Sequence, residues 1–150
     1  MRSLWAAVVL LVPAGLLVAA CGSGTSYTAT NGATVDGPVI ASEKTAESGG
    51  EDAKLTGTVV LNGACLELHS MSGETYAIAW PKGTTWDENE VAVLLSNGRL
   101  VRDGDSISGG GGYHSYSSLD PVTVSAARDC GVGQVAVLNG DPNEIEISRP

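Results

Sequence analysis

From residue 55 onward, apolar and polar residues alternate in short runs that are separated by turn-forming pairs. The runs TGTVVL and ACLELHS flank Asn62-Gly63, and similar runs flank Asn97-Gly98. Period-two alternation is typical of strands with one buried face, and Asn-Gly favours the positive φ angles of a type I′ hairpin turn. About seven or eight short strands of this kind predict an all-β fold, either a barrel or a sandwich of short hairpins.

The same alternation assigns the faces of the expected strands. Leu66 and Leu68 are expected to face the core, whereas Cys65, Glu67 and His69 point away from it. Two further strands follow the same logic: Tyr76, Ile78 and Trp80 lie opposite Ala77 and Ala79, and Ile145 and Ile147 lie opposite Glu144 and Glu146.

Later segments continue this pattern. Residues 121–126 (PVTVSA), 134–138 and 144–148 are expected to be strands because apolar residues recur at every second position. Residues 84–95 carry a competing helix signal, since Thr85 and Glu88 have the spacing of a capping box. We expect one helical turn there at most, followed by a strand.

Residues 1–20 have the organisation of a secretory signal peptide. Arg2 supplies a positive start, residues 4–20 form an unbroken apolar run, and small residues precede Cys21. A spanning helix needs about 20 apolar residues, and no cluster of charges follows this run. We therefore expect export; an uncleaved membrane helix and ordinary soluble secretion are the alternatives to the lipid anchoring described next.

The sequence V-A-A-C-G at residues 18–22 resembles the lipobox of bacterial lipoproteins. Val18 stands where that family usually has Leu. In the family the cysteine carries a diacylglycerol and becomes the new N-terminus after cleavage. The resemblance implies that Cys21 is lipidated and that the protein faces the extracytoplasmic side of the cell membrane. Two acyl chains give a stable anchor where one chain would be marginal.

With Cys21 assigned to the anchor, Cys65 and Cys130 remain as an even pair in an exported chain. Such a pair predicts one disulfide, with two free thiols as the alternative. Closing a loop of this length stabilises a domain by roughly 4 kcal/mol in the chain-entropy model.

Residues 21–54 are dominated by Gly, Ser, Thr, Ala and acidic side chains. Apart from Val39-Ile40, nothing in this segment can contribute to a core. We therefore expect the lipidated cysteine and a flexible tether at residues 21–54, followed by a small β-domain at residues 55–150.

The formal net charge is −9, with only eight Lys and Arg residues scattered along the chain. Binding to nucleic acid needs a cluster of cationic side chains that displaces counterions from phosphates. The composition therefore argues against a nucleic-acid partner.

The stretch SGGGGYHSY contains four glycines, Gly109 to Gly112, followed by His114. A phosphate cradle needs such glycines to lead into a helix, usually with a Lys, and neither follows here. The run therefore predicts a bent strand with a close backbone neighbour. Adjacent residues of an extended segment point apart, so His114 and Ser115 are not expected to form a catalytic pair. We expect no catalytic residue.

Cys65, Glu67 and His69 are spaced as a row on one strand face, but the outer two lie roughly 13 Å apart. One metal ion cannot hold both of them. The acidic turns at residues 87–90 and 103–105 do not have the spacing of an EF-hand loop. We expect neither a metal nor another cofactor.

Aromatic residues are the strongest candidates for contacting a partner. The candidates are Trp80, Trp86, Tyr113 and Tyr116, together with His114. The chain has no Phe, however, so the core needs large side chains from elsewhere. That requirement favours burial of Trp80 and Trp86.

The pattern G-x-V-x-x-x-G-x-C-L at residues 57–66, with residues 76–81 and 104–112, resembles small actinobacterial lipoproteins. The resemblance implies a single small antiparallel, OB-like barrel behind the lipobox, and no catalytic residues. We expect an envelope lipoprotein that acts as a binding or interaction module for another envelope protein or a wall polymer. The alternatives are a carrier of a small apolar ligand inside the barrel and, less favoured, a hydrolase.

Overall fold

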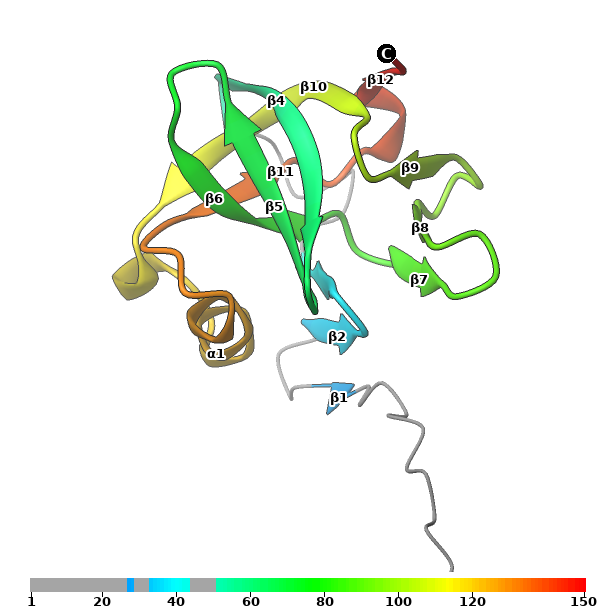
Figure 1. Cartoon of the computed structure of the whole chain (residues 1–150). Coiled ribbons are helices and arrows are strands. Elements are labelled where there is room, and N and C mark those ends of the chain that lie inside the picture. The colour runs from blue at the N-terminus through cyan, green and yellow to red at the C-terminus, as the bar shows by residue number, and fades with distance from the viewer. Residues whose placement is uncertain (1–26, 29–32, 44–50) are drawn as a thin grey trace, which may run out of the picture.

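The computed structural model describes residues 27–28, 33–43 and 51–150 (Figure 1). The expected signal peptide at residues 1–20 and the expected lipidation site Cys21 lie outside the described residues.

Five strands form a closed ring: β4 (Ala53–Asn62), β5 (Cys65–Ser70), β6 (Thr75–Trp80), β10 (Ser106–His114) and β11 (Val135–Leu138) (Figure 1). Around the ring, β4 pairs with β5, β5 with β6, β6 with β11, β11 with β10, and β10 with β4. The expected all-β fold is confirmed, as the barrel rather than the sandwich. The ring is not wholly antiparallel, because β6 and β11 run parallel.

The first expected hairpin is present, but its turn is shifted by one residue. Asn62 pairs with Cys65, so the two turn residues are Gly63 and Ala64 rather than Asn62 and Gly63. Gly63 has a φ of 62°, and among the described residues other than glycine only Val91 has a positive φ. The turn is therefore not the expected type I′, which needs positive φ at both turn residues.

Residues 33–43 belong to the folded structure, which corrects the expected tether in that part. After β1 (Tyr27–Thr28), β2 (Thr34–Asp36) and β3 (Val39–Ala41) form a hairpin. β3 then pairs in parallel with β6 of the ring, and Val39 and Ile40 are buried. Burial of this apolar pair explains why a largely polar segment is held against the barrel.

A second sheet is inserted between β6 and β10. It consists of β7 (Thr85–Asp87), β8 (Ala92–Leu94) and β9 (Leu100–Arg102), joined as antiparallel neighbours. The expected helical turn at residues 85–88 is wrong, because residues 85–87 are a strand, whereas the expected strand after it is confirmed. Near the end of the chain, β12 (Glu146–Ser148) pairs with β10.

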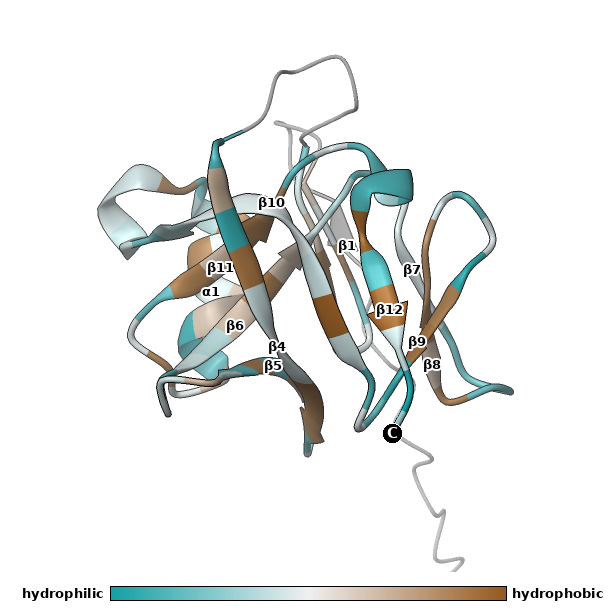
Figure 2. Ribbon diagram, turned by 90° about the horizontal axis from the view of Figure 1, so that it is seen from above, coloured by the Kyte–Doolittle hydropathy of each residue, from teal (hydrophilic) through white to brown (hydrophobic). Residues whose placement is uncertain are grey.

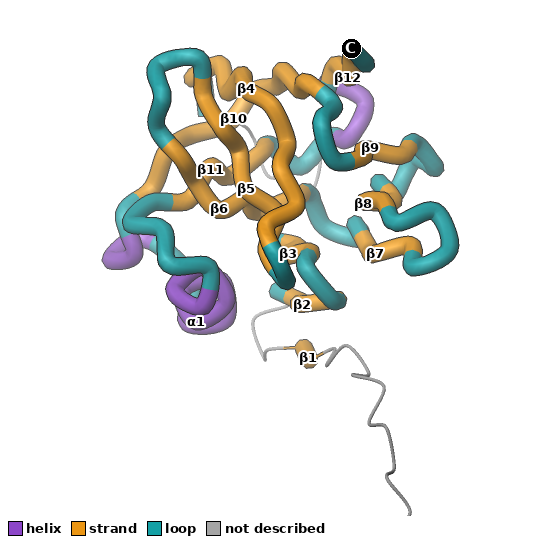
Figure 3. Tube along the Cα trace, viewed as in Figure 1, coloured by secondary structure: helices purple, strands orange, loops and turns teal. Residues whose placement is uncertain are grey.

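The expected strand at residues 121–126 is wrong, because these residues open the helix α1 (Pro121–Asp129) (Figure 3). The Asp120 carboxylate accepts hydrogen bonds from the amides of Val122 and Thr123, both at 3.0 Å, and Pro121 occupies the first helical turn. An Asp cap followed by Pro is a strong helix start. It outweighs the alternation of valines that follows.

Hydrophobic residues gather along the strands, and polar residues gather in the turns (Figure 2). The barrel interior holds Leu66, Leu68 and the face of β6 formed by Tyr76, Ile78 and Trp80. A second cluster lies outside the ring, where Ala77 and Ala79 of β6 pack with Ala126 and Ala127 of α1. The expected inward and outward faces of β5 and β6 are confirmed, and the outward face of β6 is also buried.

Candidate functional site

A disulfide joins Cys65 at the start of β5 to Cys130 just after α1, with the two Cα atoms 5.6 Å apart. The expected pairing is therefore confirmed. The bond holds α1 against the outer face of β5 and β6. α1 therefore covers part of this face.

Beside the disulfide, Glu67 is buried although its strand neighbour His69 is exposed. Its carboxylate accepts a hydrogen bond from Asn62 Nδ2 at 3.0 Å and lies 2.9 Å from His69 Nε2. These contacts compensate for the desolvation of the carboxylate. Since Cys65 is bonded to Cys130, Cys65, Glu67 and His69 do not act together as metal ligands in this state.

Trp80 is not available to a partner, because its side chain is fully buried in the barrel. This corrects its place among the candidate contact residues and agrees with the need of a Phe-free core for large side chains. Trp86 is half-buried and packs against the same core. Its amide donates to Asp36 Oδ2 at 3.0 Å, so β7 is tied to the β2–β3 hairpin.

Tyr113 and Tyr116 both have packing partners. The Tyr113 side chain is exposed, yet its ring lies 4.4 Å from that of Tyr76, centroid to centroid. The Tyr116 hydroxyl donates a hydrogen bond to the Val132 carbonyl, and the Arg128 guanidinium lies 5.3 Å from the centre of the Tyr116 ring. Both tyrosines hold neighbouring segments together; Tyr113 is exposed, whereas Tyr116 is half-buried.

Tyr76 is expected to titrate well above an ordinary tyrosine. Its hydroxyl donates to Glu74 Oε2 at 2.6 Å, and this bond, with burial, raises the pKa of Tyr76 from 10.0 to about 12. Glu74→Gln should bring that pKa back toward 10 because the negative acceptor is removed. Ultraviolet absorbance of tyrosinate measures the titration, and Tyr76→Phe identifies which transition belongs to this residue.

The raised pKa also sets the sign of a pH effect on stability. The contribution of Tyr76 to the free energy of unfolding is complete below about pH 10 and is lost as the pH rises through about 12. An unchanged Tyr76 titration in Glu74→Gln would contradict the role given to this hydrogen bond.

His114 lies between the Glu51 carboxylate and the Ser118 hydroxyl, and neither contact was predicted from the sequence. Its Nε2 is 3.0 Å from Glu51 Oε2, and its Nδ1 is 3.3 Å from Ser118 Oγ. The Ser118 hydroxyl donates its one proton to the Ser115 carbonyl at 2.9 Å. The Ser118 oxygen can therefore only accept from His114, and the imidazole is not placed to remove its proton.

Backbone donors near Ser118 are also engaged. The amide of Ser118 donates to the Ser115 carbonyl at 3.2 Å, and that of Leu119 to the Tyr116 carbonyl at 3.4 Å. A hydrolase needs donors free to stabilise an oxyanion beside the nucleophile. The contacts of Glu51, His114 and Ser118 instead join the segment before β4 to the end of β10.

The four glycines lie within β10, and none of them has a positive φ. Their missing side chains make room for neighbours. A Cβ on Gly110 would lie 2.5 Å from Asn139 Nδ2, one on Gly111 would overlap the Val137 carbonyl oxygen, and one on Gly112 would overlap the Glu51 carboxylate. The expected close approach of another backbone is therefore confirmed at Gly111.

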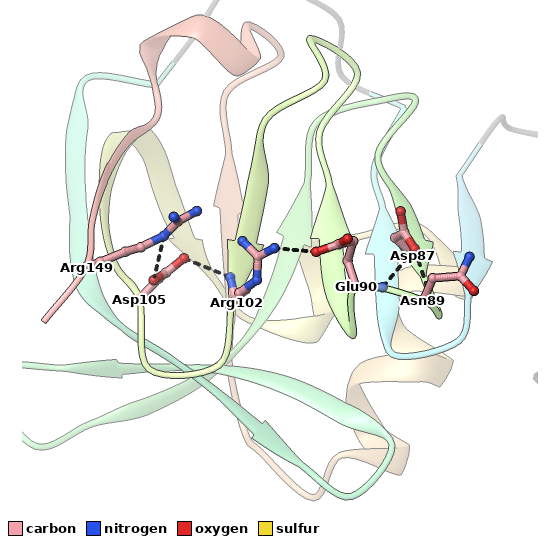
Figure 4. Close-up of polar contacts among 6 residues, drawn as sticks. All are labelled: Asp87, Asn89, Glu90, Arg102, Asp105 and Arg149. Atoms are coloured by element: carbon pink, nitrogen blue, oxygen red, sulfur yellow. Dashed lines mark hydrogen bonds and ion pairs between the residues drawn. The ribbon is translucent and has the colours of Figure 1, made fainter.

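Charged side chains form a row across β12, β9 and the β7–β8 turn (Figure 4). Arg149 Nε lies 3.7 Å from Asp105 Oδ1, and Asp105 Oδ2 accepts from the Arg102 amide at 2.8 Å. Arg102 Nη2 donates to Glu90 Oε2 at 2.6 Å, and Asp87 Oδ1 caps the adjacent turn by accepting from the Glu90 amide at 3.1 Å. The row, named here the charge row, links the second sheet to β12.

The acidic turn at residues 103–105 has one buried and one exposed carboxylate, Asp105 and Asp103 respectively. Asp105 is only 3% exposed, because the charge row and the barrel enclose it. Asp103 Oδ1 accepts from the Leu61 amide at 2.8 Å. Within residues 33–43 and 51–150, no group of three or more His, Cys, Asp or Glu side chains is arranged to hold a metal ion.

No helix in the described part of the chain is both long enough and apolar enough to cross a bilayer. Comparison with family models, with curated proteins and with solved structures finds no significant match to this chain.

Proposed function

We propose that this chain is a lipid-anchored binding module on the extracytoplasmic side of the cell membrane. Its partner is another envelope protein or a wall polymer, which meets the outer surface of the barrel. The observation that carries the proposal is the Cys65–Cys130 disulfide. Structural disulfides are common in exported proteins and rare in the cytosol, which agrees with the signal-like residues 1–20 and the lipobox-like residues 18–22.

The packing of the barrel favours an outer binding surface over an internal one. Trp80, Leu55, Leu68, Ile78 and Leu138 are among the fully buried side chains that fill the interior. A ligand pocket usually offers about 300 Å³ or more, and an apolar ligand inside this barrel would have to displace several of these side chains. The proposal therefore places no apolar ligand inside the barrel.

α1 and the second sheet lie on opposite sides of the barrel (Figure 1, Figure 2). On the side of α1, the disulfide and the helix cover the outward residues of β6. On the other side, β9 is the end strand of the second sheet, and the side chains of Glu90 and Arg149 in the charge row are exposed to a partner. We place the binding surface there.

The proposed lipidation is tested by removing the thiol of Cys21. The Cys21→Ala variant should lose metabolic labelling with fatty acid, because the thioether to diacylglycerol cannot form without the thiol. The native chain is the positive control, and Cys65→Ala/Cys130→Ala should keep its label if it is exported. Labelling that persists in Cys21→Ala would refute the proposed anchor.

The partner is sought with the native anchored protein in intact cells. A photo-crosslinker placed at Ser96, an exposed residue of the β8–β9 turn, should capture one stoichiometric partner. The same crosslinker at Ser125, an exposed residue of α1, is the matched control and should not capture it. Recovery of lipid alone from Ser96, or equal capture from both positions, would count against the proposed surface.

A further inference from the structure

A surface hollow of about 490 Å³ lies between β9 and β12, on the side of the barrel assigned above to binding. It is lined by Gly98, Arg99, Leu100, Ile147 and Arg149. The two strands are neighbours in both views of the molecule, where β12 pairs with β10 and β9 pairs with β8 (Figure 1, Figure 2).

Both ends of the hollow are fixed by contacts within the protein. At one end, Asn97 Nδ2 donates to Asn143 Oδ1 at 3.0 Å, which ties the β8–β9 turn to the residues before β12. At the other end, Asp105 holds the Arg102 amide and lies 3.7 Å from Arg149 Nε. β9 and β12 are thus held in position before any ligand binds, which lowers the entropic cost of binding.

Cationic side chains are concentrated at this hollow in an otherwise acidic protein. The described part of the chain has six Lys and Arg residues: Lys54, Lys82, Arg99, Arg102, Arg128 and Arg149. Three of them, Arg99, Arg102 and Arg149, lie in β9 or next to β9 or β12. Arg102 is paired with Glu90, but the other two line the hollow.

The guanidinium groups of Arg99 and Arg149 have N–H donors that are not engaged by described residues. Among the described residues the Arg99 guanidinium has no hydrogen-bond or ion-pair partner, although the residue is half-buried. The Arg149 side chain is 62% exposed and has one long contact, through Nε, to Asp105. Glu146 of β12 and Glu144, which precedes the strand, line a separate hollow with Asp52 and Lys54.

Leu100 and Ile147 form the apolar lining of the same hollow, and both are half-buried. Guanidinium groups match the paired oxygens of carboxylates and phosphates, and they bind such groups more strongly where water is partly excluded. We propose that this hollow binds an oxyanion, a carboxylate or a phosphate, that is attached to an apolar group. The site deepens the binding role proposed above and rests on it.

The test uses the native anchored protein, purified in a non-ionic detergent, and isothermal titration calorimetry. Phenyl phosphate and benzoate share one apolar ring and differ in the oxyanion, so together they distinguish the two sources of negative charge. Inorganic phosphate lacks the apolar group. At least one of the two ring-bearing probes should bind, and inorganic phosphate should bind about tenfold more weakly than phenyl phosphate if the phosphate is preferred.

Arg99→Gln and Arg149→Gln should each weaken the binding of the preferred probe about tenfold, because each removes a charge-assisted hydrogen bond. Arg128→Gln, on α1, makes the same change in net charge and should leave the affinity unchanged. The site is refuted if neither ring-bearing probe binds, if affinity survives both substitutions, or if Arg128→Gln lowers it equally. These results do not depend on Cys21, so a failed lipidation test and a failed anion site are distinguishable.

Discussion

Replacing Gly111 by Ala is expected to lower the free energy of unfolding by about 3 kcal/mol, the upper part of the range for overpacking. The added Cβ would overlap the Val137 carbonyl oxygen and would lie 2.6 Å from Leu55 Cδ1 and 3.2 Å from Leu138 Cα. Two of these three atoms belong to the backbone of β11. Relief therefore requires β10 and β11 to separate, and Gly111 pairs with Leu138 in that ladder.

Guanidinium unfolding of the full chain measures this effect, with two glycine substitutions as controls. Gly133→Ala adds a Cβ that meets nothing within 4 Å, and Gly133 does not have a positive φ. Gly109→Ala, in the same strand as Gly111, places its Cβ at an ordinary 3.4 Å from Leu138 Cδ2. Both should stay within about 0.5 kcal/mol of wild type, and a Gly111→Ala midpoint equal to theirs would contradict the close approach.

The glycine run shows what a single sequence can and cannot predict. The absence of a following helix and Lys was enough to predict a bent strand with a close neighbour. Which neighbour it would be had no local signal, because Asn139 and Val137 lie well beyond the next helix in the chain. Glu51, which occupies the space above Gly112, is 63 residues away from its partner His114.

The missed helix has a different cause. Asp120-Pro121 was a start signal available in the sequence, but Val122 and Val124 suggested a strand by their alternation. The short helix begins at the Asp120 cap, packs Ala126 and Ala127 against the barrel, and ends just before the disulfide-bonded Cys130. Packing of this kind depends on tertiary structure, which overrides local preference in short segments.

The hollow between β9 and β12 likewise could not be predicted from local sequence patterns. Arg99 immediately precedes β9 and Arg149 immediately follows β12, and the fold brings both of them to the same hollow. Aromatic residues were instead expected to contact a partner, because they are frequent anchors at interfaces. In this chain, which has no Phe, Trp80 is buried in the barrel interior, and charged residues lie at the exposed edges.

Removing the disulfide with Cys65→Ala/Cys130→Ala is expected to lower the free energy of unfolding by about 4 kcal/mol. The two residues are separated by 65 positions, so the unfolded chain regains the conformational entropy of a large loop. This is a large part of the 5–15 kcal/mol that is typical of small domains. The loss should also have a local component, since the bond ties the end of α1 directly to β5 and adds to the apolar packing of Ala126 and Ala127.

Unfolding in guanidinium and amide hydrogen exchange separate the two components. The global component lowers the unfolding midpoint, whereas the local one speeds exchange in α1 more than in β4, which pairs on both sides within the barrel. Wild-type protein under reducing conditions should match the double variant, and Cys21→Ala should keep the wild-type midpoint. Equal midpoints for oxidised and reduced wild type would show that the bond adds no stability, and the apolar packing of Ala126 and Ala127 with Val35, Ile40 and the outward residues of β6 would then be enough to hold α1 on the barrel.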